Sequence, residues 1–132
     1  MSEADVDVVR RSLAAFNEGD TEAVLELMDP DVELVTLRAV LEGSAYRGHE
    51  GFRQFVADMV DDWEYYHPIS ERFRDLGDGR VLVVGHFHAR GRASGVEVDT
   101  PGAWVSEVRG GKIVRVRFYS DEAAALAGLG LA

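Results

Sequence analysis

The stretch ISERFRDLGDGRVLVVGHFHARGRASGVEVDTPGAWVSEVRGGKIVRVRFY, residues 69–119, decides the fold of this chain. Three short turns that contain glycine interrupt it, at residues 77–79, 94–95 and 110–111. The runs between these turns are rich in β-branched and aromatic residues, which is typical of strands joined by tight turns. The stretch therefore predicts an antiparallel meander, with strands over residues 69–76, 80–92, 96–109 and 113–119.

The residues before this stretch predict helices. The first helix carries apolar residues at helical spacing, namely Val6, Val9, Leu13 and Phe16. Residues 17–20 end it, and a short second helix ends before Pro30. The clearest helix has one continuous apolar stripe, formed by Phe52, Phe55, Val56, Met59 and Trp63. Residues 32–41 predict one or two strands, Pro68 marks the end of the third helical region, and residues 122–127 predict a final helix.

This order of elements predicts a single α+β domain over residues 1–132. The helices pack on one face of a curved antiparallel or mixed sheet. The length agrees, since one core usually serves about 100–200 residues.

The composition excludes several classes of function. Fourteen basic residues against 24 acidic ones give a net charge of −10, so the surface repels phosphate and anionic lipid. The chain has no cysteine, which excludes disulfides, thiolate nucleophiles and iron–sulfur clusters. Residues 1–5 lack the features of a secretory signal, and no stretch approaches the roughly 18 apolar residues of a membrane span. We therefore expect a cytoplasmic protein that binds neither nucleic acid nor membranes.

Four short motifs follow one another along the chain. They are residues 16–20 (FNEGD), 46–51 (YRGHEG), 111–115 (GKIVR) and 119–121 (YSD), the last followed by an Ala-rich segment that ends in Gly128 and Leu129. In this order they resemble the nuclear transport factor 2-like superfamily, in particular its SnoaL-like members. The resemblance covers nearly the whole chain and is specific for the fold rather than for an activity.

The resemblance implies a cone-shaped sheet around a mostly apolar pocket, and a homodimer built on the outer face of the sheet. The superfamily includes ketosteroid isomerases, polyketide cyclases, epoxide hydrolases, dehydratases and non-catalytic proteins, so the fold alone does not give the function. Ketosteroid isomerases use a carboxylate base, a tyrosine and a protonated carboxylic acid. A rough alignment places Thr36, Ser12 and Ala103 at these positions, so we do not expect isomerisation by that mechanism.

The turn at residues 94–95 sets which residues of its two strands face each other. Centred there, the hairpin pairs residues whose numbers add to about 189, which places Arg90 opposite Asp99. Alternation then divides the hairpin into two faces, one with Val84, His86, His88 and Arg90 and the other with Val83, Phe87 and Trp104. The resemblance places Ala103 and Val105 toward the pocket. We therefore expect the histidine face to line the pocket and the other face to be the outer, dimeric surface; a slip of one residue would reverse both.

Glu71, His86 and His88 are the candidate catalytic residues. The turn at residues 77–79 pairs Glu71 roughly with His86, where the carboxylate would raise the basicity of the imidazole and fix its tautomer. His88 would be a second donor. A cross-strand hydrogen bond with a purely structural role would have the same geometry, so both interpretations stay open. His86 and His88 also have the spacing of two metal ligands, with Glu71 or Asp99 as a third, but we expect no metal.

The candidate substrate contacts come from several strands. Thr36 and Arg38 share one strand face, and Arg38 can hold a carboxylate or enolate oxygen or pair with an acidic side chain. Trp63 and Phe118 supply aromatic surface. The full predicted substrate-binding set is Thr36, Arg38, Trp63, Val84, Arg90, Asp99, Ala103, Val105 and Phe118.

These residues predict a protein that binds a small, largely apolar, oxygenated molecule, neutral or anionic. The sharper hypothesis is acid–base chemistry without a cofactor, as in an isomerase, cyclase, dehydratase or hydrolase. The alternative is a non-catalytic module of the same fold, for ligand binding or dimerisation. The missing functions at Ser12, Thr36 and Ala103 favour this alternative.

Overall fold

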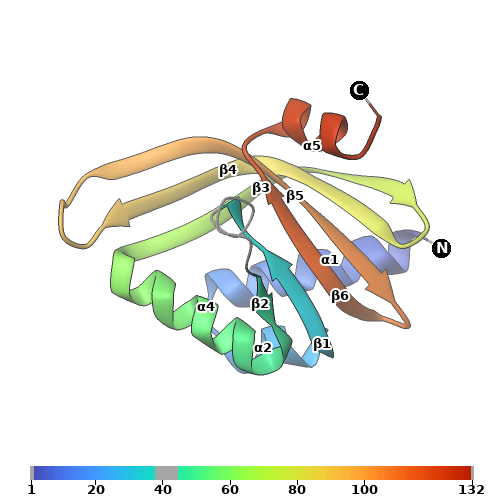
Figure 1. The fold of residues 1–132 in the computed structure, drawn as a ribbon, viewed down its shortest axis with the longest axis horizontal. Helices are drawn as coiled ribbons and strands as arrows, with labels where there is room; N and C mark the ends of the chain where they lie inside the picture. Colours follow the sequence, from blue (N-terminus) through green and yellow to red (C-terminus); the bar gives the residue numbers. More distant parts are fainter. Residues whose placement is uncertain (1, 38–44, 132) are drawn as a thin grey trace.

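A six-stranded sheet with helices on both sides forms the described part of the chain, residues 2–37 and 45–131, in a computed structural model (Figure 1). The elements follow in the order α1 (Ser2–Asn17), α2 (Thr21–Glu26), β1 (Met28–Val35), β2 (Tyr46–Arg47), α4 (Gly48–Asp62), β3 (Trp63–Gly77), β4 (Arg80–Gly91), β5 (Glu97–Arg109), β6 (Lys112–Tyr119) and α5 (Glu122–Gly128). The strand order is β2-β1-β6-β5-β4-β3. Among the strand pairs of the described residues only β1–β6 is parallel, so the sheet is mixed, and the predicted α+β fold is confirmed.

The helices begin where the sequence provides caps. The Asp20 carboxylate accepts a hydrogen bond from the Ala23 N–H at 3.1 Å and starts α2. Asp121 does the same for Ala124 at 2.8 Å and starts α5. Carboxylates at these positions satisfy N–H groups that have no partner inside the helix. Among the described residues, no helix is both long and apolar enough to cross a membrane.

Strand β3 is longer than the sequence predicts. It begins at Trp63, directly after α4, and runs through Pro68, which the sequence pattern had marked as a boundary. The strand lies at the edge of the sheet, where the missing N–H of a proline costs no ladder hydrogen bond. Strand β1 likewise begins at Met28 instead of Val32 and ends at Val35, and residues 38–41 of that predicted segment lie outside the described residues.

The two faces of the sheet pack against different helices. Figure 1 shows α1, α2 and α4 on one side of the curved sheet and α5 on the other. The inner face carries a large core in which Val83, Phe87 and Trp104 pack with residues of α1 and α4. The outer face carries a smaller cluster, in which Leu82, Ala103 and Val105 pack with Ala125 of α5. The sheet is therefore buried on both faces where it is central, and its outer face is covered only as far as α5 reaches.

Gly85 allows β3 and β4 to approach closely. A Cβ atom at this position would lie 1.9 Å from the carbonyl oxygen of Ile69 in β3. The contact is with backbone, which cannot rotate away, so a side chain here would force the two strands apart.

We predict that Gly85→Ala lowers the free energy of unfolding by about 2–3 kcal/mol, the upper part of the range of about 1–3 kcal/mol for an overpacked core position. Gly110→Ala is the matched control, because Gly110 has a φ of 59° and a methyl group added there would meet nothing within 4 Å. It should cost about 1 kcal/mol, from backbone conformation alone. Urea unfolding monitored by circular dichroism measures both values, and equal losses for the two variants would contradict the prediction.

Candidate functional site

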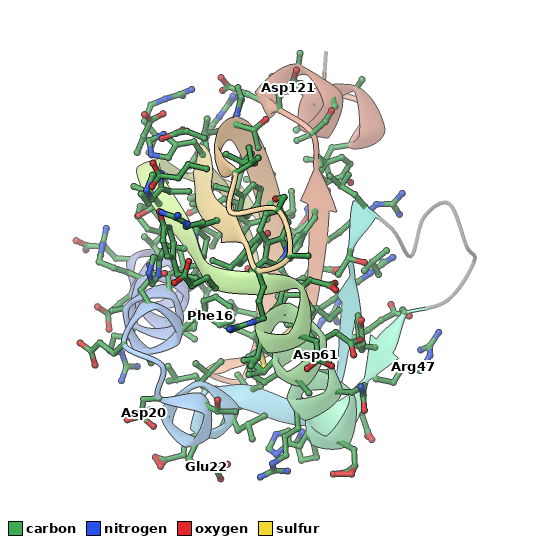
Figure 2. All side chains as sticks on the ribbon, turned by 90° about the vertical axis from the view of Figure 1, so that its left-hand side faces the viewer. Phe16, Asp20, Glu22, Arg47, Asp61 and Asp121 are labelled. Carbon is green, nitrogen blue, oxygen red and sulfur yellow. The ribbon has the colours of Figure 1, made fainter. Side chains whose placement is uncertain are left out.

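A small cavity lies between the inner face of the sheet and helices α1 and α4. Its volume is about 60 Å³, and we call it the deep cavity. Its walls are apolar except for the side chains of Ser12, Tyr66, Trp104 and Ser106, and none of the described residues that line it is charged. Phe16 contributes from α1 and lies in the interior between α1 and α4, whereas Asp20, Glu22 and Arg47 lie at the periphery (Figure 2).

A larger cavity of about 440 Å³ adjoins the deep cavity, and we call it the outer cavity. Four aromatic side chains line both cavities: Phe55, Tyr66, Phe87 and Phe118. Phe87 stacks on Tyr66 with ring centroids 5.5 Å apart and on Phe118 at 6.0 Å. These stacked rings form the boundary between the two cavities. Trp63 and Met59 extend the apolar wall outward.

The rim of the outer cavity is polar. The Tyr46 hydroxyl donates a hydrogen bond of 2.5 Å to Asp58 Oδ2, and Gln54 Nε2 donates one of 2.8 Å to Asp58 Oδ1. Asp58 and Asp62 both line the cavity, so the rim holds two carboxylates. Sequence reasoning missed Tyr46 and Asp58 as site residues. The available signal was the i, i+4 spacing of Gln54 and Asp58 beside the apolar stripe of α4.

Tyr66 has a distinct electrostatic position. It lines the deep and outer cavities, and burial raises the pKa of its phenol well above the ordinary value of 10.0. Removal from water disfavours the charged phenolate, so Tyr66 stays neutral and keeps its proton at physiological pH. The residue is therefore an available hydrogen-bond donor inside a largely apolar site.

The predicted substrate contacts divide into two groups. Thr36, Trp63 and Phe118 line the outer cavity, and Arg38 lies outside the described residues. The remaining five lie on the opposite face of the sheet: Val84, Ala103 and Val105 belong to the cluster under α5, Arg90 pairs with Glu64 at 3.1 Å, and Asp99 contacts the histidines. The expectation that these five face the pocket is therefore wrong.

The candidate catalytic residues also lie on the outer face. His86 Nδ1 is 3.6 Å from Glu71 Oε2, and His88 Nδ1 is 3.4 Å from Asp99 Oδ2. The structure thus brings Glu71 and His86 together, as expected, but away from both cavities. Tyr65 stacks on His88 with centroids 5.5 Å apart. A catalytic role of Glu71, His86 and His88 stays a prediction, and it would require a molecule bound at the outer face.

The face of the β4–β5 hairpin that was predicted to line the pocket lies on the outer side of the sheet, and this has a physical explanation. In the β4–β5 ladder His88 lies opposite Asp99 and Arg90 opposite Glu97, two residues from the predicted register. A shift of two residues keeps every side chain on its predicted side, so register is not the cause. The error lies in the alignment that placed Ala103 toward the pocket. Ala103 is buried under α5, and its neighbour Trp104 lines the deep cavity instead.

The fold and the apolar cavity between sheet and helices define a protein of the nuclear transport factor 2-like class. The chain matches the SnoaL-like domain family over residues 9–116, and it belongs to that family. The predicted resemblance is therefore confirmed.

Similar proteins cover almost the full length of the chain. An uncharacterized protein of Mycobacterium tuberculosis is 32% identical over 125 residues, which is 92% of this chain and 93% of that protein. A nuclear transport factor 2-like protein of unknown function from Burkholderia pseudomallei has a TM-score of 0.79 at 20% identity, over 94% of this chain and 95% of that one. TerC, co-crystallized with polyporic acid, has a TM-score of 0.79 at 25% identity over 97% of each chain.

We predict that Tyr66 makes the protein less stable in alkaline solution. Its raised pKa in the folded state means that the unfolded chain releases the proton first, above about pH 10. The stabilisation is therefore complete below that pH and decreases as the pH rises. Urea midpoints measured from about pH 8 to 11 should fall less steeply for Tyr66→Phe than for the wild type. Parallel curves for the two proteins would show that the Tyr66 phenol ionises normally.

Proposed function

We propose that this protein binds a small, largely apolar, oxygenated molecule in the outer cavity. The observation that carries the proposal is a cavity of about 440 Å³ walled by Trp63, Tyr66, Phe87 and Phe118. This volume lies within the range of roughly 300–1,000 Å³ that is usual for small-molecule sites. Aromatic walls with a few polar groups at the rim suit a flat molecule that carries oxygen.

The charges at the rim favour a neutral ligand. Asp58 and Asp62 would repel an anion at the entrance, whereas a hydroxyl group of the ligand can donate to a carboxylate there. The described residues that line the outer cavity include no lysine, arginine or histidine. The sequence predicted either a neutral or an anionic ligand. A neutral ligand suits these residues better.

Ligand binding without catalysis is the form of the proposal that the geometry supports best. Both oxygens of Asp58 already accept hydrogen bonds, from Tyr46 and Gln54, so this carboxylate is held as part of the rim. Acid–base chemistry without a cofactor stays a prediction. The co-crystallization of TerC with polyporic acid supports a binding role for a chain of this fold.

We predict that 1-tetralone, a flat bicyclic ketone, binds to the protein and that Trp63→Ala weakens its binding about tenfold. The substitution removes a large aromatic surface from the wall of the outer cavity. Isothermal titration calorimetry measures both dissociation constants. Val60→Ala is the control, because Val60 lies near the end of α4, three residues before Trp63, is 56% exposed and does not line the outer cavity. Failure of 1-tetralone to bind, or equal effects of the two variants, would contradict the proposal.

We also propose that the protein forms a homodimer through the part of the outer sheet face that α5 leaves uncovered. One row of this surface consists of Ile69, His86 and Pro101. Ile69 of β3 and Pro101 of β5 both lie opposite His86 of β4. Ile69 is 39% exposed although it is a large aliphatic residue. The imidazoles of His86 and His88 lie beside the carboxylates of Glu71 and Asp99, so two copies could offer each other hydrogen-bond donors and acceptors.

We predict that Ile69→Glu converts a dimer into a monomer, because it buries a charge in the proposed interface. Size-exclusion chromatography with light scattering should give twice the mass of the chain for the wild type and the mass of one chain for the variant. Val60→Glu introduces the same charge on α4, away from this surface, and should leave the dimer intact. A monomeric wild-type protein would rule out the interface.

A further inference from the structure

The deep cavity contains a polar group that the fold does not satisfy. Trp104 is 3% exposed, and its indole Nε1 is buried without an acceptor among the described residues. A tryptophan N–H can only donate, and burying a donor without a partner typically costs about 1–3 kcal/mol. Such a group is retained at a cost in stability and therefore calls for an explanation.

The surroundings of Trp104 explain why the protein provides no acceptor. In the sheet Trp104 lies opposite Val83 of β4 and Phe118 of β6, both of which have apolar side chains. The ring of Phe87 packs against it with centroids 5.4 Å apart. The hydroxyl of Ser12, which also lines the cavity, donates to the Val9 carbonyl at 2.7 Å, and its oxygen does not accept from the indole. The cavity that Trp104 lines is the space from which an acceptor atom can approach the indole.

We propose that the indole N–H of Trp104 donates a hydrogen bond to a neutral carbonyl or hydroxyl oxygen at the buried end of the ligand. This inference rests on the proposed function, since the body of the same ligand occupies the outer cavity. Tyr66 lines both cavities and so offers a second hydrogen-bond donor to a ligand that extends from one to the other. Trp104 is therefore a specificity-determining residue that selects ligands by an oxygen at their inner end.

The size of the deep cavity limits what enters it. Its volume of about 60 Å³ corresponds to only a few water-sized groups, each of which needs about 10–15 Å³ on this measure. An engineered apolar cavity of about 150 Å³ holds one benzene molecule, so the deep cavity admits less than a full ring. It suits the oxygen-bearing edge of a ligand whose ring remains beside Phe87 and Phe118.

The lack of charged side chains among the described residues of the deep cavity determines which oxygen-bearing group of a ligand can enter it. No described residue that lines it is charged, so a carboxylate or phosphate there would lose its hydration without gaining a counter-charge. A ketone or a neutral hydroxyl loses far less. The class of ligand is therefore an apolar, neutral compound with a carbonyl or hydroxyl group at one edge, and not an organic acid oriented inward.

A matched pair of probes tests the inference. 1-Tetralone and tetralin share one carbon skeleton, and only the first has an acceptor oxygen. We expect the wild type to bind 1-tetralone about three- to tenfold more tightly than tetralin, the net value of one hydrogen bond. Trp104→Phe keeps an aromatic ring but removes the N–H, and it should abolish this preference. Trp63→Phe makes the same substitution in the outer cavity and should leave the preference unchanged.

A second measurement does not require any Trp104 variant to fold. The chain has two tryptophans, so each indole N–H proton gives its own nuclear magnetic resonance signal. We expect 1-tetralone to move one of them downfield and tetralin to leave it in place, and assignment by Trp63→Phe should identify the signal as that of Trp104. If both probes bind with equal affinity and the signal does not move, the role of Trp104 is overturned while the proposed function stands. If neither probe binds, the proposed function fails and the inference fails with it.

Discussion

The ring of Phe87 lies against the backbone of Gly102, and this contact holds the ring on the inner face of the sheet. A Cβ atom at position 102 would be 2.1 Å from Phe87 Cε2, so only glycine leaves room for the ring. Phe87 is thereby held flat on the inner face, where it meets Tyr66, Trp104 and Phe118. Because side chains alternate along a strand, this one placement sends His86 and His88 to the opposite face.

The same contact also connects the two cavities of the site. Phe87 lines both of them, with its stacked neighbours Tyr66 and Phe118. A ligand that spans the cavities must pass along these rings, and its affinity then depends on aromatic contact as well as on the polar groups at each end. Helix α4 contributes the polar rim through Asp58, while β5 contributes the buried donor through Trp104. The two ends of the site thus receive their polar groups from a helix and from a strand.

Local signals in the sequence predicted most of the fold. The glycine turns predicted the meander, because a turn depends on a few adjacent residues. The caps that Asp20 and Asp121 form in the structure are equally local, since each carboxylate bonds an N–H three residues further on. Pro68 was misjudged because its cost depends on whether the strand lies at an edge, which is a property of the whole sheet. The contact between Tyr46 and Asp58 joins a strand end to a helix, and no local pattern encodes it.

Which face of the β4–β5 hairpin points inward could be predicted from side-chain packing, but not from the alignment. One side of the hairpin offers Phe87 and Trp104, which bury a large apolar area, and the other offers His86, His88 and Arg90. Burying the first set against α1 and α4 gains hydrophobic free energy, at about 25 cal/mol per Å² of apolar area. Burying the second set would require partners for three polar side chains. Once the aromatic side faces inward, it buries the indole nitrogen of Trp104, which has no acceptor among the described residues. Apolar packing alone does not account for this unpaired donor, whereas an acceptor atom of a molecule in the cavity would.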